Sequence, residues 1–151
     1  MRIYIDTSVI GGCFDEEFQE WSQKLFHEFR TGKKRAIISD VTLGELEDAP
    51  IHVRGILSSI PEKFKEIVTL DDEAIDLSYH YIKEKIVTTK SLIDTRHIAI
   101  ASVNRADILV SWNFKHIVNF DKIKQFNSIN LKLGYPLIDI RTPLEFLKYD
   151  S

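Results

Sequence analysis

The chain has 151 residues, of which 44% are apolar and 28% charged, and its formal net charge at pH 7 is −3. This length and composition predict one globular domain, residues 1–151, and exclude a disordered chain. The negative net charge argues against a module that binds nucleic acid by bulk electrostatics alone, and the single cysteine, Cys13, excludes an internal disulfide.

The chain opens with MRIYI (1–5), an apolar run that predicts a strand buried on both faces and that ends at Asp6. The start lacks the basic-then-apolar pattern of a signal peptide, and no run approaches about 18 apolar residues. We therefore expect a cytoplasmic protein with no membrane segment.

Strand and helix patterns alternate along the rest of the chain. A helix is predicted over 16–31, because its apolar residues recur at helical spacing and Gly32 follows where a C-terminal cap is expected. Further strands are predicted at 35–40, 66–70, 108–111 and in a short run after Pro136; further helices are predicted at 41–48, 50–59, 71–85, 92–105, 120–125 and from Pro143 onwards.

This alternation predicts an α/β fold with a central parallel sheet of four to five strands and helices on both faces. In such folds, ligands bind outside the carboxyl ends of the strands, near a switch in strand order. Candidate functional residues are therefore sought where the strands end.

Three acidic residues stand at such places. Asp6 follows the first strand, Glu45 lies in the helical turn after the second, and Asp94 lies in the first turn of the helix before the fourth. If the three carboxylates met within about 4 Å, each pair would repel by ~1 kcal/mol in water and ~4 kcal/mol at an effective dielectric of about 20. Such a cluster requires a cation, and oxygen ligands suit Mg²⁺ or Mn²⁺.

Each acid also has a purely structural interpretation. Asp6 could cap the turn that follows it through local hydrogen bonds. Glu45, close to Glu47 and Asp48, could be a solvated surface residue. Asp94 completes a capping box with Ser91. Only their common placement at strand ends favours a shared site.

The fourth strand leads into SWNFKHI, which predicts Asn113 beside the acids, with Ser111, Lys115 and His116 nearby. An amide can bind water or metal without adding charge, although an asparagine after a strand can also only stabilise a turn. His97 lies one turn beyond Asp94 and could reach the same site, but on so apolar a helix a hydrogen-bonded packing histidine is the favoured interpretation.

With these residues in place, the chain resembles the PIN-domain ribonucleases, and more narrowly the VapC-like toxins of type II toxin–antitoxin pairs. The resemblance covers nearly the whole chain and rests on four stretches, IYIDTSVI, SDVTLGELEDAP, LIDTRHIAIASVNRADILVSWNFKHI and PLIDIRTPLEF. It implies that Asp6, Glu45 and Asp94 hold the divalent metal, and that Thr7 or Ser8 supplies the polar group after the first acid. Many members carry a fourth acid where this chain has Asn113, which puts a second metal ion in doubt.

The resulting hypothesis is a Mg²⁺- or Mn²⁺-dependent endoribonuclease whose metal lowers the pKa of bound water for in-line attack on an RNA phosphodiester. Asn113, Ser8 and Ser111 would position water or ligand oxygens. Trp112 and Phe114 could stack on a base. A possible RNA rim comprises Arg54, Lys90, Arg96 and Lys115. The resemblance also implies a homodimer and a small antitoxin partner.

Three other functions were weighed. A catalytically weak PIN-like module that only binds RNA or protein is favoured by Asn113. A phosphatase of the haloacid dehalogenase type needs a second Asp two residues after Asp6, where this chain has Ser8. A receiver domain needs adjacent acids after the first strand and a lysine after a late one, and the sequence offers neither clearly.

Overall fold

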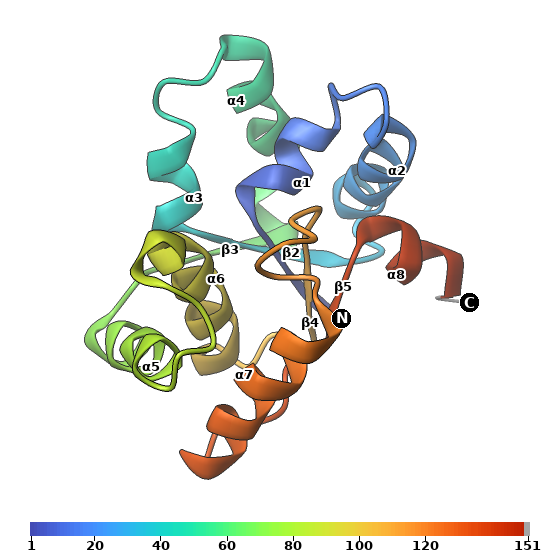
Figure 1. Cartoon of the computed structure of the whole chain (residues 1–151). Coiled ribbons are helices and arrows are strands. Elements are labelled where there is room, and N and C mark those ends of the chain that lie inside the picture. Colours follow the sequence, from blue (N-terminus) through green and yellow to red (C-terminus); the bar gives the residue numbers. More distant parts are fainter. Residues whose placement is uncertain (150–151) are drawn as a thin grey trace.

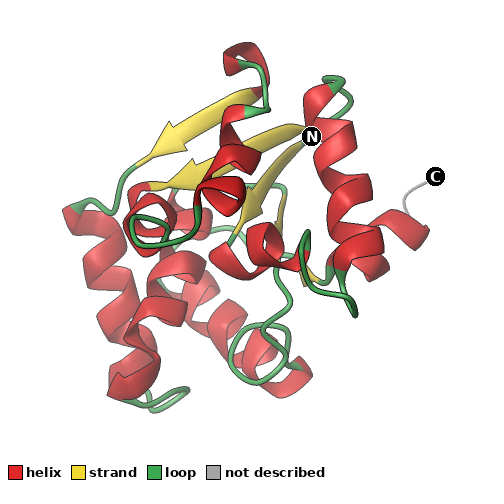
Figure 2. Cartoon of the chain, turned by 90° about the horizontal axis from the view of Figure 1, so that it is seen from above, coloured by secondary structure: helices red, strands yellow, loops and turns green. Residues whose placement is uncertain are grey.

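Five short strands form one sheet in the computed structural model, which describes residues 1–149. They are β1 (Arg2–Ile5), β2 (Arg35–Ser39), β3 (Lys65–Val68), β4 (Ile108–Val110) and β5 (Ile140–Arg141). Every neighbouring pair is parallel, and the strand order is β3-β2-β1-β4-β5. Seen from above, the arrowheads of neighbouring strands point towards a common edge (Figure 2). The predicted parallel sheet is therefore confirmed.

The central strand is buried on both faces, as its uninterrupted apolar sequence predicts. Ile3 and Ile5 point into one hydrophobic cluster, whereas Tyr4 between them points into the other. This alternation is the two-residue period of the strand, and all three side chains are completely buried. The sheet thus separates two cores.

Helices cover both faces of the sheet (Figure 1). One layer contains α1 (Thr7–Gly12), α2 (Gln19–Arg30), α4 (Ile51–Ser58) and α8 (Pro143–Tyr149). The other contains α5 (Asp72–Lys83), α6 (Leu92–Val103) and α7 (Phe120–Lys132). The short α3 (Asp40–Glu45) follows β2 and lies between the two cores. Val41 in its first turn packs against one core, and Leu46, the residue directly after the helix, belongs to the other. Two 3₁₀ turns, η1 (Glu62–Phe64) and η2 (Thr89–Ser91), complete the connections.

Helix α1 was not predicted as a helix. It begins directly after β1, where the Asp6 side chain accepts a hydrogen bond from the backbone N–H of Val9 and caps it. At its last residue, Gly12, an added Cβ would lie 2.6 Å from Oγ of Ser22 and 2.7 Å from Nε1 of Trp112. The lack of a side chain here lets α1 pack against the segment that follows β4.

Helix α7 extends to Lys132, well beyond the predicted end near residue 125. Its second half contains polar residues, and one of them, Asn130, is completely buried and hydrogen-bonded to neighbouring helices. The Tyr81 hydroxyl donates to its Oδ1, and its Nδ2 donates to Oγ of Ser102 at 2.9 Å. Buried hydrogen bonds to α5 and α6 therefore stabilise the part of α7 that the sequence pattern did not predict.

The remaining boundaries agree with the sequence to within a few residues. The predicted helix over 16–31 begins at Gln19, and the predicted strand over 66–70 begins one residue earlier and ends at Val68. The last residues of the predicted terminal helix, beyond Tyr149, lie outside the described residues. Within residues 1–149, no helix has the length and apolar character needed to cross a membrane.

Candidate functional site

The candidate site lies where β1 and β4 leave the sheet side by side. The chain starts in the middle of the sheet, so these two strands flank the switch in strand order. Ile5 pairs with Val110, and the next residue of each strand is therefore Asp6 on one side and Ser111 on the other. The place predicted for ligand binding in an α/β sheet is occupied by polar side chains.

Asp6 is only 4% exposed and is held by three donors. The hydroxyls of Ser8 and Ser111 each donate to its carboxylate at 2.6 Å, and the N–H of Val9 donates at 3.3 Å. Burial raises the pKa of Asp6, although the charge of His97 and these hydrogen bonds oppose the rise. The capping interpretation of Asp6 is confirmed, because its Oδ1 accepts the N–H of Val9 at the start of α1. This single weak bond does not compensate for the burial of a carboxylate.

Glu45 reaches the same edge from the last position of α3. Oγ1 of Thr7 donates to Oε1 of Glu45 at 2.7 Å, and Nε2 of His97 lies 2.9 Å from the same oxygen. Burial acts to raise the pKa of Glu45, but the hydrogen bonds from His97 and Thr7 and the charge of His97 outweigh it, so the pKa falls below its usual range. Glu45 is thus held in one orientation by two side chains.

As predicted, His97 is a buried, hydrogen-bonded histidine, and one of its partners is the carboxylate of Glu45. Its Nδ1 is hydrogen-bonded to the Tyr4 hydroxyl at 2.6 Å, and that hydroxyl is 2.8 Å from Oγ of Ser39. A buried chain of side chains thus runs from β2 through β1 and α6 to Glu45. The sequence signal was its spacing, because residues three apart on a helix share a face and Asp94 stands three before it.

Asp94 is bonded to Asn113 rather than to its own helix. Nδ2 of Asn113 donates to Oδ1 of Asp94 at 3.1 Å, whereas Ser91, the cap of α6, makes no side-chain capping bond. The capping-box interpretation of Asp94 is therefore wrong. Burial raises its pKa, the charges of His116 and His97 oppose the rise, and the negative charges of Asp6 and Glu45 add to it. The charges of Asp6 and Glu45 therefore act on Asp94.

The segment after β4 links Asp6 to Asp94 through hydrogen bonds. The N–H of Trp112 donates to Oγ of Ser8, and the N–H of Asn113 donates to Oγ of Ser111, each at 2.9 Å. Oδ1 of Asn113 accepts from the N–H of His116 at 3.0 Å. Asn113 is thus fixed at both ends of its amide, and it connects the Asp6 side of the site to Asp94.

The donor set consists of carboxylate, hydroxyl and amide oxygens, which is the chemistry that Mg²⁺ and Mn²⁺ prefer. In the described part of the chain, however, no three or more His, Cys, Asp or Glu side chains form a group arranged to hold a metal ion. This geometry is compatible with magnesium, which keeps several waters and is held in proteins by one or two carboxylates. The carboxylates of Asp6 and Asp94 are oxygen ligands of the kind that such an ion takes together with water.

The four residues predicted for the rim do not join this network. Throughout residues 1–149, none of them makes a hydrogen bond or ion pair with the three acids. Arg54 lines a hollow of about 310 Å³ with Leu43, Leu46 and Leu57, Lys115 is exposed, and Lys90 lies in η2. Nε of Arg96 is buried without a hydrogen-bond partner. Their role in RNA binding stays a prediction.

Comparison with known proteins identifies relatives by fold only. No family model matches the chain, and no curated protein matches its sequence. Among solved structures it is similar to Mycobacterium tuberculosis VapC20, a sarcin-ricin loop cleaving toxin, with TM-score 0.59, 11% identity, and 76% of this chain and 92% of that chain covered.

Two structures of VapBC are also similar. The structure of VapBC2 from Rickettsia felis bound to a DNA fragment from its promoter gives TM-score 0.61 and 13% identity, over 94% of this chain and 98% of that chain. DNA-bound VapBC from Salmonella typhimurium gives TM-score 0.52 and 16% identity over 95% of this chain and 98% of that chain. The chain therefore has the VapC-like PIN-domain fold that its sequence predicted.

Proposed function

We propose that this protein is a divalent-metal-dependent endoribonuclease that hydrolyses RNA phosphodiesters and acts as the toxin of a toxin–antitoxin pair. The observation that supports this most is Asp6, a buried carboxylate at the switch point whose donors are two hydroxyls and one backbone N–H. A buried carboxylate with no basic partner in contact calls for a cation. The solved VapC and VapBC structures with the same fold supply the reaction class.

Asp6 and Asp94 would hold the ion, and Glu45 would approach it through water, oriented by Thr7 and His97. When bound, Mg²⁺ or Mn²⁺ lowers the pKa of coordinated water and offsets the charge that develops on the phosphate. Asn113 holds Asp94 in place, while Ser8 and Ser111 fix the orientation of Asp6.

Two partners follow from this proposal. Since two of the similar structures are VapBC complexes, a small antitoxin protein is the proposed regulator of this chain. A homodimer is proposed as the form that acts on RNA. Both can be tested by sizing the purified protein alone and together with the product of an adjacent open reading frame.

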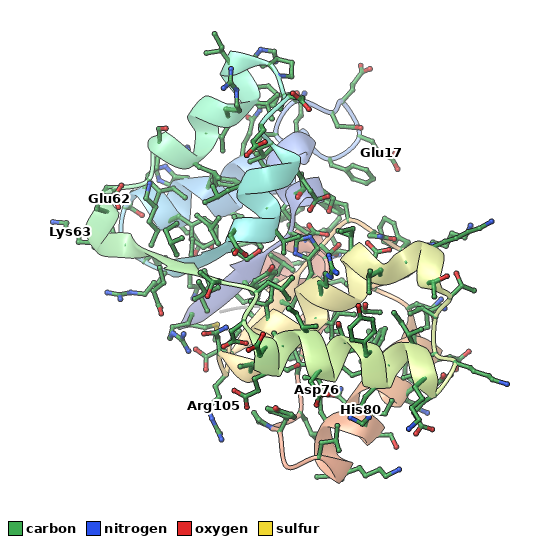
Figure 3. All side chains as sticks on the ribbon, turned by 90° about the vertical axis from the view of Figure 1, so that its left-hand side faces the viewer. Glu17, Glu62, Lys63, Asp76, His80 and Arg105 are labelled. Carbon is green, nitrogen blue, oxygen red and sulfur yellow. The ribbon has the colours of Figure 1, made fainter. Side chains whose placement is uncertain are left out.

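The decisive experiment measures cleavage of single-stranded and structured RNA by the purified protein in Mg²⁺, in Mn²⁺ and in chelator. Cleavage is expected only with metal, and Asp94→Asn is expected to lower it by about 100-fold or more. A matched control is Asp76→Asn, which removes an exposed acid on the outer face of α5, where Figure 3 labels it beside His80. Equal turnover in Asp94→Asn and Asp76→Asn would remove Asp94 from the mechanism.

A second candidate is a PIN-like module that binds RNA or a protein partner without efficient catalysis. The described residues favour it in one respect, since no group of three acids or histidines among them is arranged to hold a metal. Asn113 also stands where a fourth acid would add a ligand. Metal-dependent RNA binding with no cleavage by pure protein would select this function.

A further inference from the structure

Three aromatic rings gather beside the candidate site. Phe18 and Trp112 stack with ring centroids 4.3 Å apart and planes 18° apart, and Nε1 of Trp112 donates to Oγ of Ser22 at 2.9 Å. Phe114 lies 6.3 Å from each of these rings, tilted by 41° and 48°. Trp112 is 8% exposed, whereas Phe114 is 53% exposed. Two rings are thus part of the structure, and the third presents an open face to solvent.

The exposed ring is tied to the acidic site by the backbone. Phe114 directly follows Asn113, whose amide holds Asp94, and the N–H of Trp112 is bonded to Ser8 beside Asp6. Consecutive Cα atoms are about 3.8 Å apart, so the Phe114 ring is anchored within one residue of the network that would hold the reacting phosphate. A ring exposed by half would bury apolar area on binding a flat ligand.

The charge of the protein favours a ligand that binds through uncharged contacts. A chain of net charge −3 with three acids at its site gains little from long-range attraction to phosphate. Stacking of a base on an aromatic ring is independent of charge, and each stacked base contributes substantially to binding of single strands. Affinity for RNA at this site must therefore come largely from the metal and from uncharged contacts.

We propose that Phe114, supported by Phe18 and Trp112, stacks on an unpaired base next to the phosphate to be cleaved. This inference rests on the proposed function and deepens it, because it makes a single-stranded or looped RNA segment the substrate. A base inside a duplex is already stacked on both faces and cannot use this ring.

The test measures the Kd of short single-stranded oligonucleotides with a phosphorothioate backbone, which slows hydrolysis, in the presence of Mg²⁺. One oligonucleotide carries all its bases, and the others carry an abasic site at each position in turn. The native protein is expected to bind one of the abasic oligonucleotides about 5- to 150-fold more weakly. Phe114→Ala is expected to bind that oligonucleotide and the complete one equally, and Phe114→Trp to restore the difference.

Two variants control for general effects. Tyr79→Ala removes another aromatic ring that is 53% exposed, on α5 near Asp76 and His80, and is expected to behave as the native protein does. Phe114→Leu keeps an apolar side chain but no ring, and is expected to lose the discrimination as Phe114→Ala does. Both Phe114 variants should show the thermal transition of the native protein, since the side chain is half exposed.

The proposal is overturned if the native protein binds all oligonucleotides equally, or if Phe114→Ala keeps the discrimination. The same holds if Phe114→Ala weakens only the binding of a protein partner, because the ring would then belong to a protein interface. Cleavage is scored separately with unmodified RNA. Base discrimination without any cleavage would contradict the nuclease function but support the stacking site. Cleavage without discrimination would support the nuclease function and contradict the stacking site.

Discussion

The two ends of the sheet treat their acidic residues differently. Near the amino ends of the strands, Nε and Nη2 of Arg2 donate to the two carboxylate oxygens of Glu66 at 2.8 and 3.0 Å, and the Arg2 N–H donates to Asp107 at 2.7 Å. The hydrogen bond from Arg2 lowers the pKa of Glu66. At the carboxyl ends, and within residues 1–149, Asp6 and Asp94 accept hydrogen bonds only from hydroxyl, amide and backbone donors, and burial raises the pKa of both. Glu45 at this edge differs, because His97 lies beside it and its pKa is lowered.

The comparison separates charges that stabilise the fold from charges kept for another purpose. In the bidentate pair of Arg2 and Glu66, each charge is neutralised by its partner, so no further ion is needed. Asp6 and Asp94 are acids whose pKa is raised by burial, and they cost stability unless a cation binds, which is the pattern expected of a functional site. Four predictions test whether the two ends differ in this way.

The largest expected effect is on stabilisation by metal. If Asp6 is a ligand, Mn²⁺ at about 100 times its Kd should stabilise the native protein by about 2.7 kcal/mol, and Asp6→Asn should abolish this gain. Thermal unfolding with and without Mn²⁺ measures it. Glu66→Gln, at the opposite end of the sheet, should retain the full gain. An equal gain in Asp6→Asn would place the ion elsewhere.

Loss of the group that orients Glu45 should have a smaller effect. Thr7→Val removes the hydroxyl that donates to Glu45 but keeps the shape of the side chain. Metal affinity, read from a titration of the thermal transition, should fall by about 10- to 100-fold. Thr31→Val, which removes a hydroxyl bonded to the end of α2, serves as the control and should leave the affinity unchanged. An unchanged midpoint in Thr7→Val would show that Glu45 does not reach the ion.

Without metal, Asp94→Asn should stabilise the protein at neutral pH. The folded pKa of Asp94 is raised, so the folded state binds its proton more tightly, and stability falls as pH rises from about 3.9 through the folded pKa. The variant lacks this loss and keeps an acceptor for Asn113. A rise of about 2–4 °C corresponds to 1 kcal/mol for a chain of this length. Melting in chelator should show the difference above that pKa and none near pH 3.

The smallest effect is expected at the amino end, with the opposite sign. Glu66→Gln should lower stability at pH 7 by about 0.5–1 kcal/mol, since the pair with Arg2 is partly exposed. The folded pKa of Glu66 is lowered, so its contribution is present above the unfolded value and is lost as pH falls through the folded pKa. Urea unfolding at pH 7 and pH 3 tests this, and a variant as stable as the native protein at both would contradict it.

The sequence predicted the fold well because most helices and strands have a recognisable local pattern of apolar residues. The run RIYI is apolar throughout, and the apolar residues of α2 and α5 recur at helical spacing, so strands and helices were identified nearly where they lie. The two misses have different causes, one local and one tertiary. Helix α1 depends on a cap from Asp6, and the second half of α7 depends on buried bonds from Asn130 to two other helices.

The candidate site could be predicted in its residues but only partly in its contacts. Placement at strand ends singled out Asp6, Glu45, Asp94 and Asn113. Hydrogen bonds through Ser111 and Asn113 link Asp6 to Asp94, whereas Glu45 is held separately by Thr7 and His97. The sequence predicted a hydrogen-bonded, buried His97 but not its partners, because Tyr4 and Glu45 lie on other elements of the fold. The capping box of Asp94 was a valid local pattern that a partner 19 residues away overrode.

By itself, the sequence determined that the chain alternates strands with helices and that acidic side chains follow the strands, because both depend on neighbours a few residues apart. Only the tertiary structure decided the strand order, which sets β1 beside β4, and the contact of Glu45 with Thr7 across 38 residues. Such contacts depend on how separate elements pack, and a hydrogen bond that requires placement within a few tenths of an ångström has no local signature in the chain.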